Sequence, residues 1–315
     1  MRYWTNRLVE TVPLLLGISL LAFTMFRLAP GDPLALVVDP TLLSEEERAA
    51  VRDQMGLNDP FPVQYGTMMW RLVTGDLRSF KSTQPTSEII ADAFPVTALI
   101  GGLGLGIAVV VALALGTLAG RRPGGWVDRG VSTTIVTSLA IPSFLLGLIL
   151  VRLFTEEWGL LPGSGIAPVG TVGFHPQPEY LVMPAAVVAI GTAPILARYL
   201  RDGLVGVLAD DYVRTARAKG LGETAVMLRH ALRNALIPVI GLLNTLIPVT
   251  LGGSVIVETV FGLPGLGKVT TSAALARDYP VVLANVLFVA VLTLGINLVV
   301  DLLYGAIDPR IRVQE

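Results

Sequence analysis

Residues 95–119 read PVTALIGGLGLGIAVVVALALGTLA, a stretch without a single charged side chain. The hydrocarbon core of a bilayer is about 30 Å thick, and a helix needs roughly 20 apolar residues to cross it. A helix also bonds its backbone polar groups internally, which the lipid interior requires. This stretch therefore predicts a transmembrane helix, and it sets the class of the whole chain.

The overall composition agrees with a membrane protein. Of 315 residues, 53% are hydrophobic and only 15% are charged, whereas soluble domains have roughly 25% charged residues. The mean hydropathy is +0.69. The net charge of −1 argues against a nucleic-acid partner, because nucleic-acid-binding domains usually carry a basic stripe. The chain has no cysteine, which excludes disulfides, iron–sulfur clusters and thiol catalysis.

Six stretches are long and apolar enough to cross a membrane, and together they predict an all-α membrane protein with six transmembrane helices. They lie at 8–28, 95–119, 131–153, 181–199, 236–256 and 282–304. The first is too long for the apolar part of a signal peptide and lacks a small-residue cleavage site. We expect one membrane domain over 1–315, with a polar insertion at 30–94 and a core of five spans at 95–304.

The basic residues predict which side of the membrane each connection faces. Most of the 23 Lys and Arg residues fall in segments on one side, and short connections rich in Lys and Arg stay in the cytoplasm. The short connections of the other side, near 154–180 and 257–281, hold only Lys268 and Arg277. Both termini are therefore expected in the cytoplasm.

The polar segment 30–94 is then an extracytoplasmic insertion, which we expect to be small and ordered. It contains turn sequences at Pro30–Pro33 and Asn58–Pro60. Ser44 is followed three residues later by Glu47, the spacing of a capping box at the start of a helix.

The cytoplasmic segment 200–235 is longer than the usual connection between helices, which predicts a structure and a task of its own. Asp210 and Asp211 can cap a helix, and Gly220 can end it. We therefore expect a short helix over Tyr212–Lys219, outside the membrane.

Ala216 and Gly220 lie four residues apart and predict a helix face small enough for close approach by another protein. Charged residues surround this face: Arg214, Arg217 and Lys219. The alternative is an interfacial helix that rests on anionic lipid headgroups. Such binding needs bulky apolar anchors, and only Tyr212 and Val213 qualify.

The same segment resembles a known motif. Residues 211–221 (DYVRTARAKGL) and 228–238 (LRHALRNALIP) are similar to the cytoplasmic "EAA" loop of ABC importer permeases. Ala216 and Gly220 stand at its recurring small positions, while Arg214 stands where many members have Glu. The chain resembles most the first, B-type permease subunit of dipeptide, oligopeptide and nickel importers. Other matching motifs are LAPGDP (28–33), GDL (75–77), SLAIPSF (138–144), VETVFGLPGLG (257–267) and DLLYGAIDPR (301–310). Arg78 departs from the family, because many relatives have Gly there, followed soon by Ser.

The resemblance implies a type I ABC importer permease fold that forms the solute pathway in the inner membrane of a prokaryote. It implies partners: a second homologous permease subunit, two cytoplasmic ATP-binding subunits, an extracytoplasmic solute-binding protein and membrane lipid. ATP and Mg would be bound by the ATPase subunits, and this chain would bind no cofactor. Short peptides are the implied cargo, with a nickel chelate, glutathione or a sugar as alternatives. The residues implied to couple the chain to its ATPases are Tyr212, Arg214, Ala216, Arg217, Lys219, Gly220 and Leu221.

Three polar residues within the expected spans are candidates for the pathway or a gate. Glu258 lies near the outer end of the fifth span, and an ionisable residue at membrane depth is a functional hypothesis; alternatively, it lies among the headgroups. Asn244 and Asn285 either line a wet pathway or bond between helices, the commoner case.

Small residues and prolines also mark the spans. The pairs Gly102/Gly106 and Gly116/Gly120 permit close helix packing, most often within one subunit. Pro142 and Pro238 are expected to break helical hydrogen bonding locally.

We expect no enzyme chemistry. GLPGLGK at 262–268 has P-loop spacing, but Val269 replaces the Ser or Thr that binds Mg²⁺, and no strand pattern precedes it. His175 and His230 fall on opposite sides of the membrane and cannot share a metal. A secondary transporter would need an ionisable relay at mid-membrane, which is missing. A scaffold that recruits ATPases without transport stays open.

Overall fold

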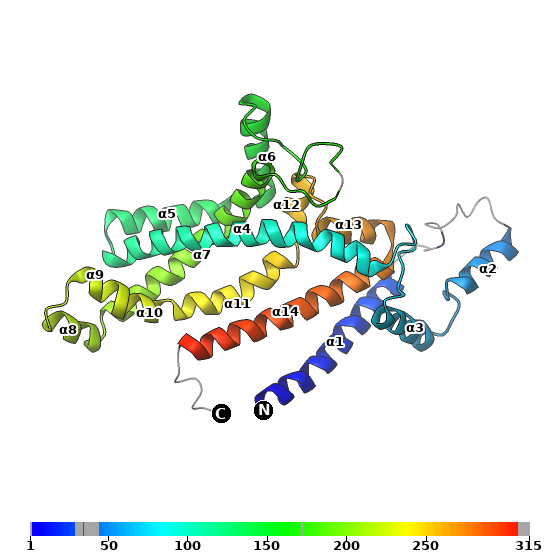
Figure 1. The fold of residues 1–315 in the computed structure, drawn as a ribbon, viewed down its shortest axis with the longest axis horizontal. Helices are drawn as coiled ribbons and strands as arrows, with labels where there is room; N and C mark the ends of the chain where they lie inside the picture. Colours follow the sequence, from blue (N-terminus) through cyan, green and yellow to red (C-terminus); the bar gives the residue numbers. More distant parts are fainter. Residues whose placement is uncertain (1, 29–33, 35–43, 172, 308–315) are drawn as a thin grey trace. The chain divides into compact units, whose positions relative to one another are not determined.

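The structure is a computed structural model that describes residues 2–28, 34, 44–171 and 173–307. Within these ranges the chain is helical, with no strand beyond an isolated bridge between Arg78 and Pro85 (Figure 1). The longest helices are α1 (Arg2–Leu28), α4 (Thr86–Arg121), α7 (Pro178–Leu208) and α14 (Tyr279–Ile307). The shorter helices are α2 (Glu45–Gln54), α3 (Phe61–Thr74), α5 (Trp126–Ala140), α6 (Ser143–Val151), α8 (Asp211–Ala218), α9 (Glu223–Ala225), α10 (Leu232–Ala235), α11 (Ile237–Leu251), α12 (Val255–Val260) and α13 (Leu266–Ala276). Two π-helical segments are η3 (Arg152–Glu157) and η4 (Val226–Ala231).

The expected membrane architecture is confirmed. Among the described residues, five helical segments are long and apolar enough to cross a bilayer, or six if the bent pair α5 and α6 counts as one span. That pair is bent by 93°, so the third predicted span, 131–153, is not one continuous helix. Pro142 explains the break, because it has no N–H to donate and forces the preceding residue out of helical geometry. Ile141 is indeed extended, with φ −93° and ψ 117°.

One predicted boundary is corrected, because α4 begins at Thr86, so the last residues assigned to the polar insertion are already helical and continue into the second span. The predicted local interruption at Pro238 is confirmed: α10 ends at Ala235, Leu236 separates it from α11, and Pro238 lies in the first turn of α11. In the first turn a missing N–H costs nothing, since that group has no partner within the helix.

The insertion contains the predicted capping box. The Ser44 Oγ accepts the Glu47 N–H at 3.3 Å, and Glu47 Oε2 accepts the Ser44 N–H at 2.9 Å. The hydrogen bond from the Ser44 backbone, helped by the one from its hydroxyl, holds the pKa of the Glu47 carboxyl below its ordinary value. The predicted turn at Pro30–Pro33 lies outside the described residues, as does the end of the motif at 301–310.

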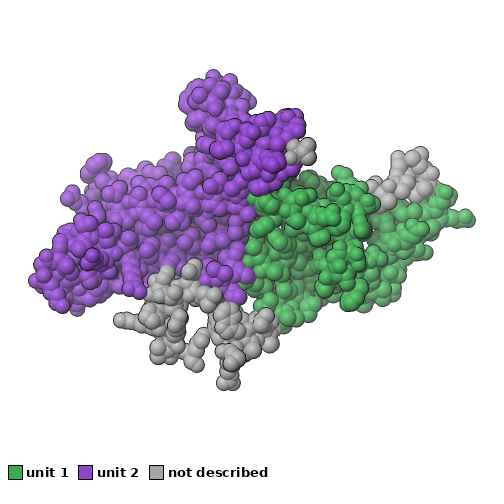
Figure 2. All heavy atoms as spheres, in the orientation of Figure 1, with its two compact units in different colours: residues 1–95, 264–294 green, residues 96–263, 295–315 purple. Residues whose placement is uncertain are grey.

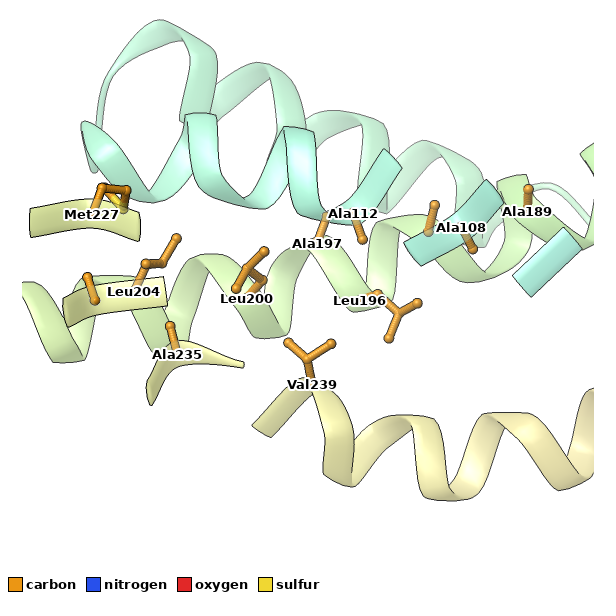
Figure 3. Close-up of a cluster of buried hydrophobic side chains, with 12 residues drawn as sticks. Ala108, Ala112, Ala189, Leu196, Ala197, Leu200, Leu204, Met227, Ala235 and Val239 are labelled. Carbon is orange, nitrogen blue, oxygen red and sulfur yellow. The ribbon is translucent and has the colours of Figure 1, made fainter. Parts of the chain in front are cut away.

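The chain divides into two compact units (Figure 2). One comprises residues 1–95 and 264–294, the other 96–263 and 295–315. Two of the three boundaries fall within α4 and α14, and the third falls in the turn between α12 and α13. In the first unit, Leu77 and Leu266 belong to a buried apolar cluster. The second unit has a larger cluster built mainly on α4 and α7 and rich in alanine, part of which Figure 3 shows.

Glycines let the backbones of α4 and α7 approach closely. A Cβ added to Gly104 would lie 2.5 Å from the Cβ of Val188, and one on Gly116 would lie 2.8 Å from the Ala197 carbonyl oxygen. Gly120 meets the Cβ of Leu204 at 2.9 Å in the same way. The pair Gly116/Gly120 therefore packs within the chain, as predicted.

The other predicted pair does not. Added Cβ atoms on Gly102 and Gly106 would meet no described atom within 4 Å, and both glycines are exposed. Gly104, between them on the opposite face of α4, makes the contact instead. A sequence rich in glycine does not itself reveal which face is covered.

Gly104→Ala and Gly102→Ala form a matched pair that tests this packing. Both variants gain helix propensity, but only the first forces a methyl group against Val188. We expect Gly104→Ala to be less stable than Gly102→Ala by about 1–3 kcal/mol, the usual cost of overpacking. Thermal unfolding of the purified proteins in detergent measures the difference, and equal melting temperatures would contradict the assigned face.

Candidate functional site

The short helix α8 (Asp211–Ala218) follows α7 and confirms the predicted helix to within one residue at each end. It ends as expected at Gly220, whose φ is +83°. The Gly220 N–H donates to the Arg217 carbonyl at 2.9 Å, and the Leu221 N–H donates to the Ala216 carbonyl at 3.4 Å. This pair of bonds is a Schellman motif. At the other end the prediction was wrong, because Asp210 occupies the N-cap position but its side chain makes no capping bond.

One face of α8 is buried against its own chain. Val213 is 0% exposed and Ala216 is 5% exposed, and both pack with Val226 of η4. Val207 and Leu208 at the end of α7 complete this cluster. Ala216 therefore points into its own chain and offers no surface to a partner. The prediction that Ala216 and Gly220 form a small face open to another protein is wrong for Ala216.

The exposed surface of α8 and its C-cap carries three basic side chains, beside the acidic Asp211, with which Arg214 pairs at 3.5 Å. Arg214, Arg217 and Lys219 are exposed, as are Tyr212, Gly220 and Leu221. Six of the seven residues that the family resemblance marked thus remain open to solvent, and only Ala216 does not. We call the surface formed by Arg214, Arg217 and Lys219 the basic face of α8.

Polar contacts hold α8 in place. The Tyr212 hydroxyl accepts a hydrogen bond from the Asn234 side-chain amide at 2.7 Å. Arg217 and Glu223 form an ion pair, with Nε to Oε1 at 2.8 Å. The hydrogen bond from Arg217 holds the pKa of the Glu223 carboxyl below its ordinary value, so the pair persists at neutral pH. Both ends of α8 are thus connected to the segment that follows it.

That segment packs on α7. Met227, Ala231 and Ala235 share one buried cluster with Leu200 and Leu204, and Figure 3 shows Leu204 beside Ala235. A Cβ on Gly203 of α7 would lie 2.8 Å from the Ala235 carbonyl oxygen, so the two backbones are in close contact. The segment that follows α8 is therefore packed directly on a membrane-length helix.

An ion pair joins α7 to α5 near the same end. Arg201 donates two hydrogen bonds to Asp128, Nε to Oδ1 at 2.9 Å and Nη2 to Oδ2 at 2.7 Å. The Asp128 side chain is only 7% exposed. It also accepts the Gly124 N–H at 2.8 Å. This bidentate geometry fixes the ends of both helices against each other.

The three polar residues predicted for a pathway or gate have different surroundings. Glu258 is 2% exposed in α12 and accepts a hydrogen bond from the Thr97 hydroxyl at 2.8 Å. Asn285 donates to the Thr270 hydroxyl, as expected for a bond between helices. The buried side-chain oxygens of Asn285 and Asn244 have no hydrogen-bond partner among the described residues. Glu258 in α12 and Asn244 in α11 belong to the second unit, and Asn285 in α14 belongs to the first.

The P-loop resemblance at 262–268 has the wrong structural context. A helix, α12, precedes it where a nucleotide-binding loop follows a strand. Among the described residues, no group of His, Asp and Glu side chains is arranged to hold a metal ion.

Sequence reasoning missed the residues that position α8. Asn234 and Glu223 are not among the predicted site residues, although they lie within the segment predicted to have a task of its own. Arg201 counts only as one of the 23 Lys and Arg residues used to predict orientation, and Asp128 is not among the predicted residues. Asp128 and Arg201 lie 73 residues apart, and a single sequence does not reveal that they form a pair.

Ala216→Phe and Ala218→Phe test the orientation of α8. Ala216 is buried and Ala218 is exposed on the same helix. We expect Ala216→Phe to lower stability by about 1–3 kcal/mol through overpacking, with Ala218→Phe close to wild type. Thermal unfolding and protease cleavage within 205–235 report the result. Equal stability of both variants would contradict the observed face.

Arg201→Met tests the ion pair. It leaves the buried Asp128 carboxylate without its cation, which typically costs about 3–5 kcal/mol. Arg198→Met is the control, because Arg198 is 67% exposed and lies 3.8 Å from Asp202, and exposed pairs contribute about 1 kcal/mol or less. Thermal unfolding should separate the two variants clearly; a small loss in Arg201→Met would mean that the pair is dispensable.

Known proteins resemble this chain over its whole length. Residues 112–313 match the family described as binding-protein-dependent transport system inner membrane component, and residues 1–101 match its N-terminal counterpart. The oligopeptide transport system permease protein AppB of Bacillus subtilis is 39% identical, covering 98% of each chain. The glutathione transport system permease protein GsiC of Salmonella choleraesuis is 39% identical, covering 99% of each chain.

Solved structures agree on the fold. A chain of the MetNI methionine ABC transporter in an inward-facing conformation superposes with a TM-score of 0.53 at 19% identity, covering 77% of this chain and 98% of that one. A chain of an amino acid ABC transporter gives a TM-score of 0.51 at 17% identity, covering 69% and 93%. The chain therefore belongs to the family of binding-protein-dependent transport system inner membrane components, and it is a permease of an ABC importer.

Proposed function

We propose that this permease imports short peptides and that α8 is the helix through which separate ATPase subunits drive it. The observation that carries the proposal is the construction of α8: one face is packed on its own chain while the basic face is open. A helix fixed on one side and free on the other can receive a partner and pass on its movement.

The route of that movement runs through named contacts. The Tyr212–Asn234 hydrogen bond connects α8 to α10, and α10 packs on α7 through Ala235. The Asp128–Arg201 pair then connects α7 to α5. When two ATPases close around ATP and Mg, which they and not this chain bind, α8 would be pushed and α7 and α5 would follow. The pathway would thereby change the side to which it opens.

The remaining assembly follows from the family. A second homologous permease subunit would complete the pathway, and a solute-binding protein would deliver cargo on the outer side, where residues 30–94 and 257–281 lie. Both termini and α8 would face the cytoplasm of a prokaryote. Within the pathway we assign gate or lining roles to Glu258 and Asn244, and a packing role to Asn285.

The cargo assignment rests on the relatives. Permeases named for oligopeptide, peptide and glutathione transport align over nearly all of this chain. Glutathione is itself a tripeptide, so these names share one chemistry. A nickel chelate or a sugar is the alternative cargo.

Charge reversal on the basic face tests the coupling assignment. The double variant Arg214→Glu/Lys219→Glu changes two exposed residues, so folding and membrane insertion should be normal. We expect loss of ATPase co-purification and at least a tenfold fall in ATP-driven peptide uptake into proteoliposomes. Arg122→Glu, an exposed residue of another connection on the same side, is the control.

The outcomes separate the competing functions. Normal ATPase binding and uptake in the double variant would reject α8 as the docking helix. Uptake driven by an ion gradient without ATP would indicate a secondary transporter, and an assembled complex that hydrolyses ATP without uptake would indicate a scaffold.

A further inference from the structure

The unit formed by residues 1–95 and 264–294 contains a cleft of about 410 Å³. Its lining comes from four places in this unit. These are the end of α2 and the turn after it, one side of α3, the loop 76–83, and Pro280. Pockets for small molecules usually measure roughly 300–1,000 Å³. The cleft is therefore large enough for a small organic ligand, and no role described above uses it.

The walls of the cleft are fixed by polar contacts. The Asn58 amide donates to Asp53 Oδ1 at 2.5 Å, and the Gln64 amide donates to the carbonyl oxygens of Leu57 and Asp59 at 2.9 and 2.7 Å. These bonds hold the turn between α2 and α3. A ligand would therefore meet a preformed surface on this side, which lowers the entropic cost of binding.

The opposite wall is held by one buried carboxylate. Asp278, at the turn between α13 and α14, is 4% exposed. It accepts hydrogen bonds from the Ser79 hydroxyl and, at 3.0 Å, from the Phe80 N–H. Arg78 in the same loop donates to the Thr83 carbonyl at 3.0 Å. The loop 76–83 is thus tied to the body of its unit.

Three charged side chains that line the cleft take no part in these hydrogen bonds. Arg71 of α3, Asp59 and Asp76 line it, and none has a side-chain hydrogen bond or ion pair with any described residue. Charges of opposite sign that line one cleft without pairing with each other suit a ligand that carries both signs. Met68 and Phe80 add apolar surface to the same lining.

We propose that this cleft binds a free short peptide before it enters the pathway. Arg71 would bind the α-carboxylate, because a guanidinium matches a carboxylate in shape and charge. Asp76 and Asp59 would bind the α-ammonium group, and Met68 and Phe80 would contact an apolar side chain. The inference rests on the proposed function, since it requires peptide cargo and an outward-facing insertion.

The test uses the complete transporter, reconstituted in nanodiscs without ATP and without the solute-binding protein. The probe is radiolabelled Ala-Phe-Ala, measured by equilibrium dialysis, with its N-acetylated and C-amidated forms as competitors. The variants are Arg71→Gln and Asp76→Asn. Lys81→Gln and Glu46→Gln are matched controls, because both residues are exposed in the same unit and neither lines the cleft.

We expect the wild-type complex to bind the free tripeptide, and each cleft variant to weaken binding about tenfold or more, as loss of a charge-assisted hydrogen bond predicts. The controls should bind like wild type. C-amidation should weaken binding to wild type but add no further loss in Arg71→Gln, and N-acetylation should behave likewise with Asp76→Asn.

Unchanged affinity in both cleft variants, or equal binding of the blocked peptides, would overturn the proposal. So would cleft variants that bind peptide normally but lose affinity for the solute-binding protein, since the cleft would then be a protein-docking surface. ATP-driven uptake with the binding protein present is measured in parallel. If wild type imports no peptide, the proposed function fails; if import is normal and only the cleft effects are missing, this inference alone fails.

Discussion

Lipid supplies no hydrophobic force that holds one transmembrane helix against another, so close contact and polar bonds must do so. In this chain the contact between α4 and α7 meets that requirement. Gly104 and Gly116 remove the side chains that would keep the two backbones apart. Leu200 and Leu204 of α7 then fill the space beside α4 and α10. α5, α6, α10 and α11 of this unit also pack on α7.

α7 is consequently the element that connects α8 and the segment after it to the membrane-length helices of this unit. Its end carries Arg201, which binds Asp128 of α5, and its surface receives α10 and η4. α8 reaches α7 only through these neighbours and through the small cluster around Val213. α8 is thus fixed to its neighbours by one buried face and by two polar contacts.

The sequence was sufficient for the architecture and for the position of α8. Long uncharged stretches, the capping box at Ser44 and the stop at Gly220 are local signals, and local signals predict local structure well. The sequence could not predict which side of a helix faces the rest of the chain. Whether Ala216 points inward, or whether Gly104 and not Gly102 meets a neighbour, depends on which surface the rest of the chain covers. A helix of eight residues has too few positions for its pattern to decide this.

The pairing of charged residues is likewise not predictable from the sequence, and it separates charges with a structural role from those that could bind a ligand. Asp128 and Arg201 compensate each other, so their burial is explained by structure alone. Glu223 and Arg217 likewise form a pair that positions a helix. Arg71 and Asp76 are exposed and lie in a shared cleft without such partners among the described residues. Two opposite charges in one cleft fit a ligand that carries both signs, and for an importer a zwitterionic peptide cargo is such a ligand.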